Sequence, residues 1–252
     1  MQIPSSTVAE IMGKAGYDWV AIDLEHAGFC LHNLADIFRA LENGGTCPFA
    51  RVAQSHPKDI KQALDAGAQG LILPMIESKE QLEQAVAWAY YPPMGVRGVG
   101  YARANSFGKK FHSYVQKDSK DIVIVAQIEH IRAVQELDGI LVVNGLDAIM
   151  IGPYDLSGSM GLTAQFDHPF FLENMDIIFR KAREYNIPMG LHIVQPDAEI
   201  LKSKIISGYQ FIAYGIDAVF LYQSADALDI IKDFHIACGY IGFREYRAHS
   251  CS

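Results

Sequence analysis

Seven short, almost continuously apolar runs recur along this chain of 252 residues, and longer amphipathic stretches separate them. Runs of this kind are typical of strands that are buried on both faces of a parallel sheet. They cover residues 19–23, 48–52, 70–74, 122–128, 148–152, 188–193 and 211–215. Helical periodicity predicts helices over residues 5–15, 31–43, 57–66, 78–89, 130–143, 168–185, 196–207 and 224–237. The repeated strand-then-helix order predicts right-handed crossovers and a parallel sheet.

This alternation fits a single (β/α)8 TIM barrel, an α/β fold that commonly takes about 250 residues. A closed barrel needs an eighth strand, and only Met1–Ile3 precedes the first predicted helix. We therefore expect the first strand to be truncated at the N-terminus. The competing fold is an open doubly wound sheet, which normally carries a glycine-rich turn after its first strand. Residues 21–27 contain no glycine. We assign residues 1–237 to one barrel domain and residues 238–252 to a C-terminal tail.

The chain is acidic, with a formal net charge of −8 and no basic cluster. This balance argues against nucleic acid as a partner, since nucleic-acid-binding proteins carry a basic patch. No apolar run reaches the ~18 residues of a membrane span, which argues against a membrane partner. The four cysteines form no CxxC pair, so we expect reduced thiols and a cytoplasmic location. Small anionic substrates remain compatible, because local charge at a site can oppose the net charge.

Polar residues gather where the predicted strands end, and barrel proteins place their active sites at the carboxyl ends of the strands. These residues are Asp23, His26, Arg51, Gln127, Glu129, His130, Asp155, His192 and Asp217. Burial of so many ionisable groups without partners would be costly, so a bound metal or a charged ligand is the simpler explanation. Glu129 and Asp155 follow neighbouring strands. Two carboxylates suit a hard divalent cation that also binds water and substrate oxygens.

The positions of the lysines limit the chemistry, since none lies on a predicted strand. Schiff-base catalysis needs a desolvated lysine that points into the site. A carbanion would therefore be stabilised by a metal that acts as a Lewis acid. Structural explanations stay open for the same residues. Asp23 can cap a turn, His26 can be a hydrogen-bonded structural histidine, and Glu129 with Asp155 can form a plain hydrogen-bonded pair.

Six motifs stand in order along the chain. They are Ile-Asp-Leu-Glu-His at 22–26, Ala-Arg-Val at 50–52, Leu-Ile-Leu-Pro-Met at 71–75, Pro-Pro-Met-Gly-Val-Arg-Gly-Val-Gly at 92–100, Gln-Ile-Glu at 127–129 and Ile-Gly-Pro-Tyr-Asp-Leu-Ser at 151–157. Together they resemble the HpcH/HpaI aldolase (HpcH/HpaI aldolase/citrate lyase) family, over about residues 3 to 235. Each motif alone is weak, and the set is specific for the family without being specific for one substrate.

The resemblance implies a class II, divalent-metal-dependent aldolase, which is a carbon–carbon lyase, on a barrel of the phosphoenolpyruvate/pyruvate type. Such enzymes reversibly cleave a 4-hydroxy-2-oxo acid, such as a 2-keto-3-deoxy sugar acid, to pyruvate and an aldehyde through a metal-stabilised enolate. In this pattern Glu129 and Asp155 match the ligands of a metal, Mg²⁺ or Mn²⁺ with Co²⁺ as a third choice. Arg51 matches the arginine that faces the 2-oxo group, and His26 matches the histidine that transfers protons through a water.

The resemblance also implies supporting residues and an assembly. Asp23 and Asp65 match acidic residues that support the histidine, and in the family the second one comes from a neighbouring subunit. Asp65 therefore implies a homo-oligomer, a hexamer or a trimer, in which it reaches across the subunit interface. The other residues expected to bind substrate, besides Arg51, are Gln127, Gly152, Pro153, Tyr154 and Asp155, with backbone N–H groups at 152–155 receiving its carboxylate.

Two other functions stay open. A CoA-ester lyase of the citrate or malyl-CoA type shares the barrel and the metal pair, but it needs a basic groove for the nucleotide phosphates, and the acidic balance argues against it. A non-catalytic barrel that serves as a binding or assembly subunit is the second alternative. The joint presence of His26, Arg51, Glu129 and Asp155 argues against it.

Overall fold

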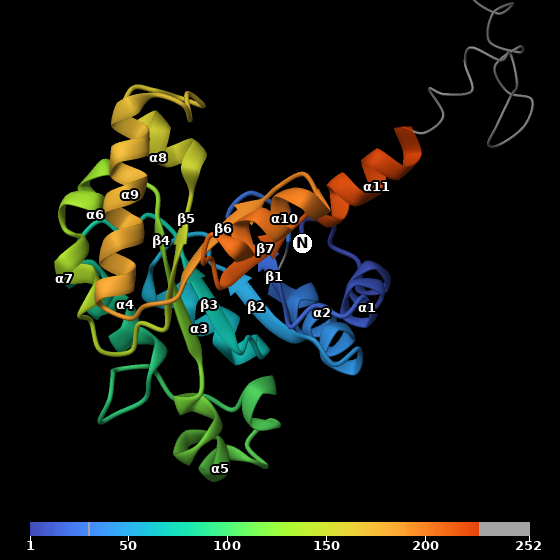
Figure 1. Ribbon diagram of the computed structural model, residues 1–252. Coiled ribbons are helices and arrows are strands. Elements are labelled where there is room, and N and C mark those ends of the chain that lie inside the picture. The colour runs from blue at the N-terminus through green and yellow to red at the C-terminus, as the bar shows by residue number, and fades with distance from the viewer. Residues whose placement is uncertain (30, 227–252) are drawn as a thin grey trace, which may run out of the picture.

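Seven parallel strands form one curled sheet in the computed structural model, which describes residues 1–29 and 31–226 (Figure 1). The strands are β1 (Trp19–Asp23), β2 (Cys47–Arg51), β3 (Gly70–Leu73), β4 (Val123–Ile128), β5 (Ala148–Ile151), β6 (Met189–Ile193) and β7 (Phe211–Tyr214). Each pairs in parallel with the next in chain order. The α/β class, the parallel sheet and all seven predicted strands are confirmed.

Most helices connect successive strands and cover the outer face of the curl, whereas the last helix follows β7 and projects away from the sheet (Figure 1). The main ones are α1 (Ser6–Lys14), α2 (Leu31–Asn43), α3 (Pro57–Ala66), α4 (Lys79–Ala89), α6 (Ile131–Gln135), α7 (Leu137–Leu141), α9 (Pro169–Glu184), α10 (Ala198–Ile206) and α11 (Asp217–Asp226). Shorter elements lie in the long connections, namely η1 (Arg103–Asn105), α5 (Phe111–Gln116), η2 (Asp118–Lys120) and α8 (Pro153–Ser159).

Two helix predictions need correction. The helix expected over residues 130–143 is two short helices, because Glu136 takes a non-helical conformation (φ −95°, ψ 11°) between them. That break lets α7 bury Leu137, Ile140 and Leu141. Of the helix expected over residues 224–237, only residues 224–226 lie in the described part of the chain. They belong to α11, which begins at Asp217. Residues 227–237 and the predicted tail at 238–252 lie outside the described residues.

Both faces of the sheet are buried, which explains the continuous apolar runs. Side chains such as Leu71, Leu73 and Ile124 pack outward against the helices. Ile72 and Val125 point to the inside of the curl, because successive side chains of a strand alternate between faces. Inside the curl, the rings of Trp19 from β1 and Phe211 from β7 stack with centroids 4.3 Å apart. The first and last strands of the sheet therefore approach each other across the interior.

The first residues of the chain link β1 to the start of α11, the helix that follows β7. The N-terminal ammonium of Met1 donates to the carbonyl of Ala21 at 2.6 Å, and the N–H of Asp23 donates to the carbonyl of Met1 at 3.1 Å. The N–H groups of Gln2 and Ile3 donate to the carboxylate of Asp217 at 2.7 and 2.9 Å. Residues 1–3 form no strand, so the described residues make a curled seven-stranded sheet and not the closed eight-stranded barrel that we expected.

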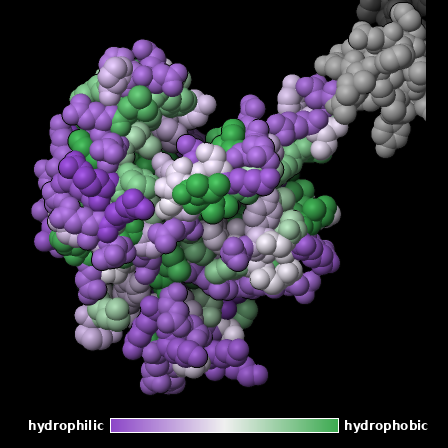
Figure 2. Space-filling model, viewed as in Figure 1, coloured by the Kyte–Doolittle hydropathy of each residue, from purple (hydrophilic) through white to green (hydrophobic). Residues whose placement is uncertain are grey.

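The C-terminal edge of the described fold is its least buried part. No residue of α10 is buried, and all four residues of β7 are only half-buried. Figure 2 shows an apolar area where α10 crosses the visible face, and Ile205 and Ile206 of that helix are both exposed. Within residues 1–29 and 31–226, no helix combines the length and the apolar character that crossing a bilayer requires.

We expect Gly44→Ala to lower the free energy of unfolding by ~1–3 kcal/mol, the usual result of overpacking. A Cβ at residue 44 would lie 2.3 Å from the backbone carbonyl carbon of Gly13, so α1 would have to move away from α2. Urea denaturation followed by circular dichroism measures the change. Gly100→Ala is the control, because nothing lies within 4 Å of a Cβ at that position. Equal stability of the two variants would contradict the close approach of the helices.

Candidate active site

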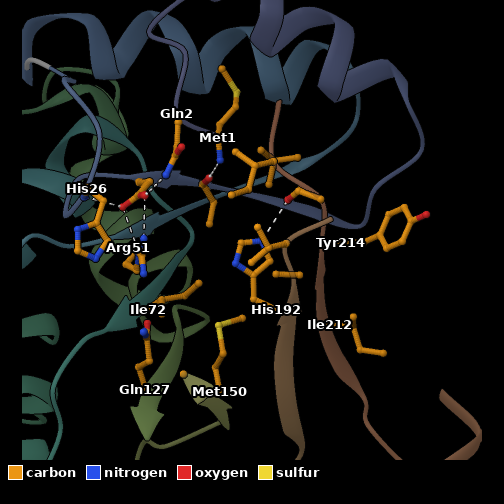
Figure 3. A pocket seen from close by; sticks show the side chains of 18 of the residues that line it. Met1, Gln2, His26, Arg51, Ile72, Gln127, Met150, His192, Ile212 and Tyr214 are labelled. Carbon is orange, nitrogen blue, oxygen red and sulfur yellow. Dashed lines mark hydrogen bonds and ion pairs between the residues drawn. The ribbon is translucent and has the colours of Figure 1, made fainter. Parts of the chain in front are cut away.

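A cavity of about 290 Å³ lies inside the curl and includes the carboxyl ends of the strands (Figure 3). Its wall holds most of the residues that the sequence placed at strand ends. These are Asp23, His26, Arg51, Gln127, Asp155, His192 and Asp217. The expected substrate-binding residues Gly152, Pro153 and Tyr154 also line it, whereas Glu129 and His130 are not among the described residues of the wall. The parallel topology therefore brings together residues that are up to 194 positions apart in the chain (217 − 23).

Asp23 and Arg51 form the central ion pair of this cavity. The register of β1 and β2 sets the two residues opposite each other at the last position of each strand. Arg51 donates from Nε to Asp23 Oδ1 at 3.1 Å and from Nη2 to Oδ2 at 2.7 Å, which is a bidentate contact. Burial by itself would raise the pKa of Asp23, but the hydrogen bonds from Arg51 and Gln2 outweigh it and lower the pKa to about 2.

Asp23 also holds the loop that carries His26. Its Oδ1 accepts the backbone N–H groups of Glu25 and His26, each at 3.1 Å, and its Oδ2 accepts the side-chain amide of Gln2 at 3.0 Å. With the two bonds from Arg51, this carboxylate accepts five hydrogen bonds. Asp23 thus contacts the backbone of His26, and the ring of His26 projects into the mouth of the cavity with its side chain 61% exposed.

Glu25 is a member of this cluster that the sequence did not single out. Its side chain is only 18% exposed, and Oε2 lies 3.2 Å from Arg51 Nη1 and 3.7 Å from His26 Nε2. Among the described residues this buried oxygen has no hydrogen-bond partner. Burial raises the pKa of Glu25 and outweighs the opposing effect of the Arg51 charge. Its position between Asp23 and His26 was the available signal.

Glu129 directly follows β4 and is buried. Its Oε1 accepts the N–H of Met75 at 2.7 Å, and its Oε2 accepts the side-chain amide of Gln127. Met75 has a φ of +53°, which is uncommon for a residue other than glycine and is often associated with functional sites. Burial raises the pKa of Glu129 to about 7, and the negative charges of Glu25 and Asp155 add to the shift.

The donors beside Glu129 fit a divalent cation. Gln127 Oε1 is buried and has no hydrogen-bond partner among the described residues. A Cβ at residue 152 would lie 2.8 Å from Glu129 Oε2, so Gly152 leaves that oxygen uncovered on this side. Asp155, in the first turn of α8, lines the same cavity. Carboxylate and amide oxygens are the donors that hard divalent cations prefer. In the described part of the chain, no three or more His, Cys, Asp or Glu residues form a metal-binding group, so a cation bound here would need water or substrate oxygens to complete its coordination.

Asp65 lies apart from the other predicted residues. It is near the end of α3, and it is not among the described residues that line the cavity. Its carboxylate accepts a hydrogen bond from Arg97 Nη2 at 2.7 Å, and the Arg97 side chain is fully buried. The guanidinium carbon of Arg97 lies 4.7 Å from the centre of the Tyr91 ring. A single chain therefore does not bring Asp65 to His26.

Two further predicted residues have structural contacts. His192 Nε2 lies 3.2 Å from the carbonyl oxygen of Gly215, and burial lowers the pKa of this histidine. The carboxylate of Asp217 receives the backbone N–H groups of Gln2 and Ile3, as described above. Both side chains shape the wall of the cavity.

Comparison with known proteins connects this geometry to a family. The profile of the HpcH/HpaI aldolase/citrate lyase family matches residues 2–224. The chain is 34% identical over 230 residues to a hydroxypyruvate/pyruvate aldolase of Roseobacter denitrificans, covering 90% of this chain and 89% of that protein. It is 36% identical over 231 residues to a 5-keto-4-deoxy-D-glucarate aldolase of Escherichia coli O157:H7, covering 91% and 88%. A solved HpcH/HpaI aldolase/citrate lyase family protein from Burkholderia cenocepacia superposes with a TM-score of 0.86 at 30% identity and 92% coverage of both chains.

The lowered pKa of Asp23 predicts a loss of stability in acid. A carboxylate with a pKa of about 2 in the folded state, against its ordinary value of 3.8, stabilises the fold above pH ~4. This contribution, on the order of 2 kcal/mol, disappears as the pH falls from ~4 toward ~2. Urea denaturation between pH 7 and pH 3 should show the difference between wild type and Asp23→Asn shrinking with falling pH. Asp36→Asn, on the surface, should follow wild type, and a pH-independent Asp23→Asn difference would contradict the shift.

Proposed function

Because the chain belongs to the HpcH/HpaI aldolase/citrate lyase family, we propose that it is a class II aldolase that reversibly cleaves a 4-hydroxy-2-oxo acid to pyruvate and an aldehyde. The aldolase relatives share about nine tenths of their length with this chain, and an aldolase is a carbon–carbon lyase. The observation that carries the proposal is the cavity in which Arg51, His26 and Asp155 meet beside a buried Glu129.

Glu129 and Asp155 are the residues that we propose to hold a divalent metal, Mg²⁺ or Mn²⁺ with Co²⁺ as a third choice. Three features support this assignment. Gln127 has a buried oxygen without a hydrogen-bond partner among the described residues, Gly152 leaves space beside Glu129, and the carboxylates of Glu25, Glu129 and Asp155 repel one another. When bound, the metal supplies Lewis-acid polarisation of the 2-oxo group.

Arg51 is placed to stabilise negative charge on the substrate. A guanidinium has five N–H donors, and Asp23 takes one from Nε and one from Nη2. Three donors remain, and of these Nη1 lies 3.2 Å from Glu25 Oε2. In cleavage, the bond between C3 and C4 breaks and its electron pair moves toward the 2-oxo oxygen. A fixed positive charge at that oxygen lowers the activation free energy of cleavage, because the negative charge on the oxygen develops only in the transition state.

His26 is the residue that we propose to receive the proton of the 4-hydroxyl group, through a water. Loss of this proton lets the 4-carbon leave as an aldehyde, and a proton delivered to C3 afterwards yields pyruvate. The exposed ring of His26 at the mouth of the cavity suits a proton relay that contacts water.

The substrate carboxylate is expected at the start of α8, with one refinement. The N–H of Gly152 already donates to the carbonyl of Ile128 at 3.1 Å, and Pro153 has no N–H. The N–H groups of Tyr154 and Asp155 are therefore the donors that we assign to the carboxylate.

Three further assignments belong to this proposal. We place the catalytic barrel in residues 1–237, followed by a tail over 238–252, and we propose a closed (β/α)8 barrel for the active protein. The hydrogen bonds of residues 1–3 to Ala21, Asp23 and Asp217 support closure at that edge. We also propose a homo-oligomer, a hexamer or a trimer, in which Asp65 serves a neighbouring subunit, in line with its distance from the cavity of its own chain.

Chelation tests the metal assignment. We expect pyruvate formation from a panel of 4-hydroxy-2-oxo acids, followed with lactate dehydrogenase, to stop in EDTA and to return with excess Mg²⁺ or Mn²⁺. Full activity in EDTA, or inactivation by borohydride in the presence of pyruvate, would contradict the metal mechanism. Cleavage of malyl-CoA in place of the panel would assign a CoA-ester lyase instead.

Substitution of Arg51 tests its role in charge stabilisation. We expect Arg51→Ala to reduce kcat/KM by roughly 10²–10³-fold, the usual effect of removing a group that stabilises the transition state. The far-ultraviolet circular dichroism spectrum should be retained. Arg39→Ala is the matched control, because Arg39 pairs with Asp36 on the surface outside this cavity. A folded Arg51→Ala protein with near-normal turnover would remove Arg51 from the mechanism.

A further inference from the structure

Glu25 stands out among the groups that the proposed mechanism leaves unused. Its Oε2 is buried and without a hydrogen-bond partner among the described residues, although it lies between two residues of the mechanism. Arg51 Nη1 is 3.2 Å away on one side and His26 Nε2 is 3.7 Å away on the other. The ion pair with Arg51 offsets part of the cost of burying this carboxylate oxygen, but no well-aligned hydrogen bond completes it, so its place between these two groups needs an explanation.

Asp23 does not fill this role. Its two oxygens already accept five hydrogen bonds, and the one that reaches His26 comes from the backbone N–H. Asp23 therefore holds the backbone at the start of the loop, but it does not set the direction in which the imidazole ring of His26 points. The other charged groups that face the cavity beside His26 come from separate elements. They are the N-terminal ammonium of Met1, Asp23 at the end of β1, Arg51 at the end of β2, Asp155 in α8 and Asp217 in α11, and the buried Glu129 after β4 acts on Glu25 electrostatically without lining the cavity.

We infer that Glu25 is a positioning residue, which orients the His26 ring through Nε2 and balances the charge that the ring gains when it accepts a proton. The inference rests on the proposed function, because it assigns the proton to His26. A small turn of the exposed ring brings Nε2–H into a hydrogen bond with Glu25 Oε2. This bond selects the tautomer with its lone pair on Nδ1, which takes the proton of the 4-hydroxyl group through water. A carboxylate that orients a catalytic histidine in this way acts by fixing tautomer and direction.

Glu25→Gln is the central variant, because it keeps the size of the side chain and removes its charge. We expect kcat for pyruvate formation to fall by ~10–100-fold, the range typical of outer-sphere orienting groups. KM and Mn²⁺ affinity, measured by electron paramagnetic resonance, should stay near wild type. Glu77→Gln is the matched control, since Glu77 is 20% exposed and also lies between an arginine and a histidine, Arg132 and His130, outside the cavity lining.

A double-mutant cycle tests whether Glu25 acts through His26. In a His26→Asn background, Glu25→Gln should change the residual rate by less than about twofold, because the group that it positions is gone. A loss as large as in the wild-type background would overturn the inference. Wild-type kcat in Glu25→Gln would overturn it too.

A readout independent of turnover separates this inference from the proposed function. The rate at which diethylpyrocarbonate modifies the peptide that contains His26, measured by mass spectrometry at pH 6, should rise in Glu25→Gln but not in Glu77→Gln. We expect roughly a fivefold increase, the effect of unit charges about 4 Å apart in a water-like medium. If no 4-hydroxy-2-oxo acid is cleaved, the proposed function fails, and this rate still decides whether Glu25 holds the ring. An unchanged rate overturns the inference.

Discussion

The ion pair between Asp23 and Arg51 is the contact on which the geometry of the site depends. It joins the last residues of two neighbouring parallel strands, which the register places side by side. The same carboxylate holds the loop of His26 by its backbone and the side chain of Gln2. One buried anion therefore ties together the start of the chain, β1, the first loop and β2. Removal of either partner of such a pair destabilises the fold, mainly because the other charge is then left buried and unpaired.

The charges around this pair are not balanced within the described residues. Glu25, Glu129 and Asp155 all act electrostatically on one another near a single guanidinium, and burial raises the pKa values of Glu25 and Glu129. The divalent cation that we propose for this group would supply the missing positive charge at its oxygen donors. Such a cation would also let an acidic chain receive an anionic 2-oxo acid, because local charge and not net charge governs binding at the site.

The strands were predictable because both of their faces are buried, which makes each a continuous apolar run between amphipathic helices. The residues at strand ends were predictable because parallel strands in chain order all finish at the same edge. Glu25 was missed because its position between Asp23 and His26 was the only local signal, and that position does not tell a carboxylate that faces solvent from one enclosed between Arg51 and His26. The break at Glu136 was missed because tertiary packing of Leu137 and Ile140 overrides the helical periodicity on either side.

The sequence by itself determined the order of the elements, the parallel sheet and the residue types at its carboxyl edge, because these depend on local periodicity and on short-range connection rules. Only the tertiary structure decided that the sheet of the described residues stays open, that Asp65 pairs with Arg97 away from the cavity, and that Glu25 Oε2 lies between Arg51 and His26. Those outcomes depend on curl, register and side-chain direction, which arise from contacts between residues that are distant in the sequence.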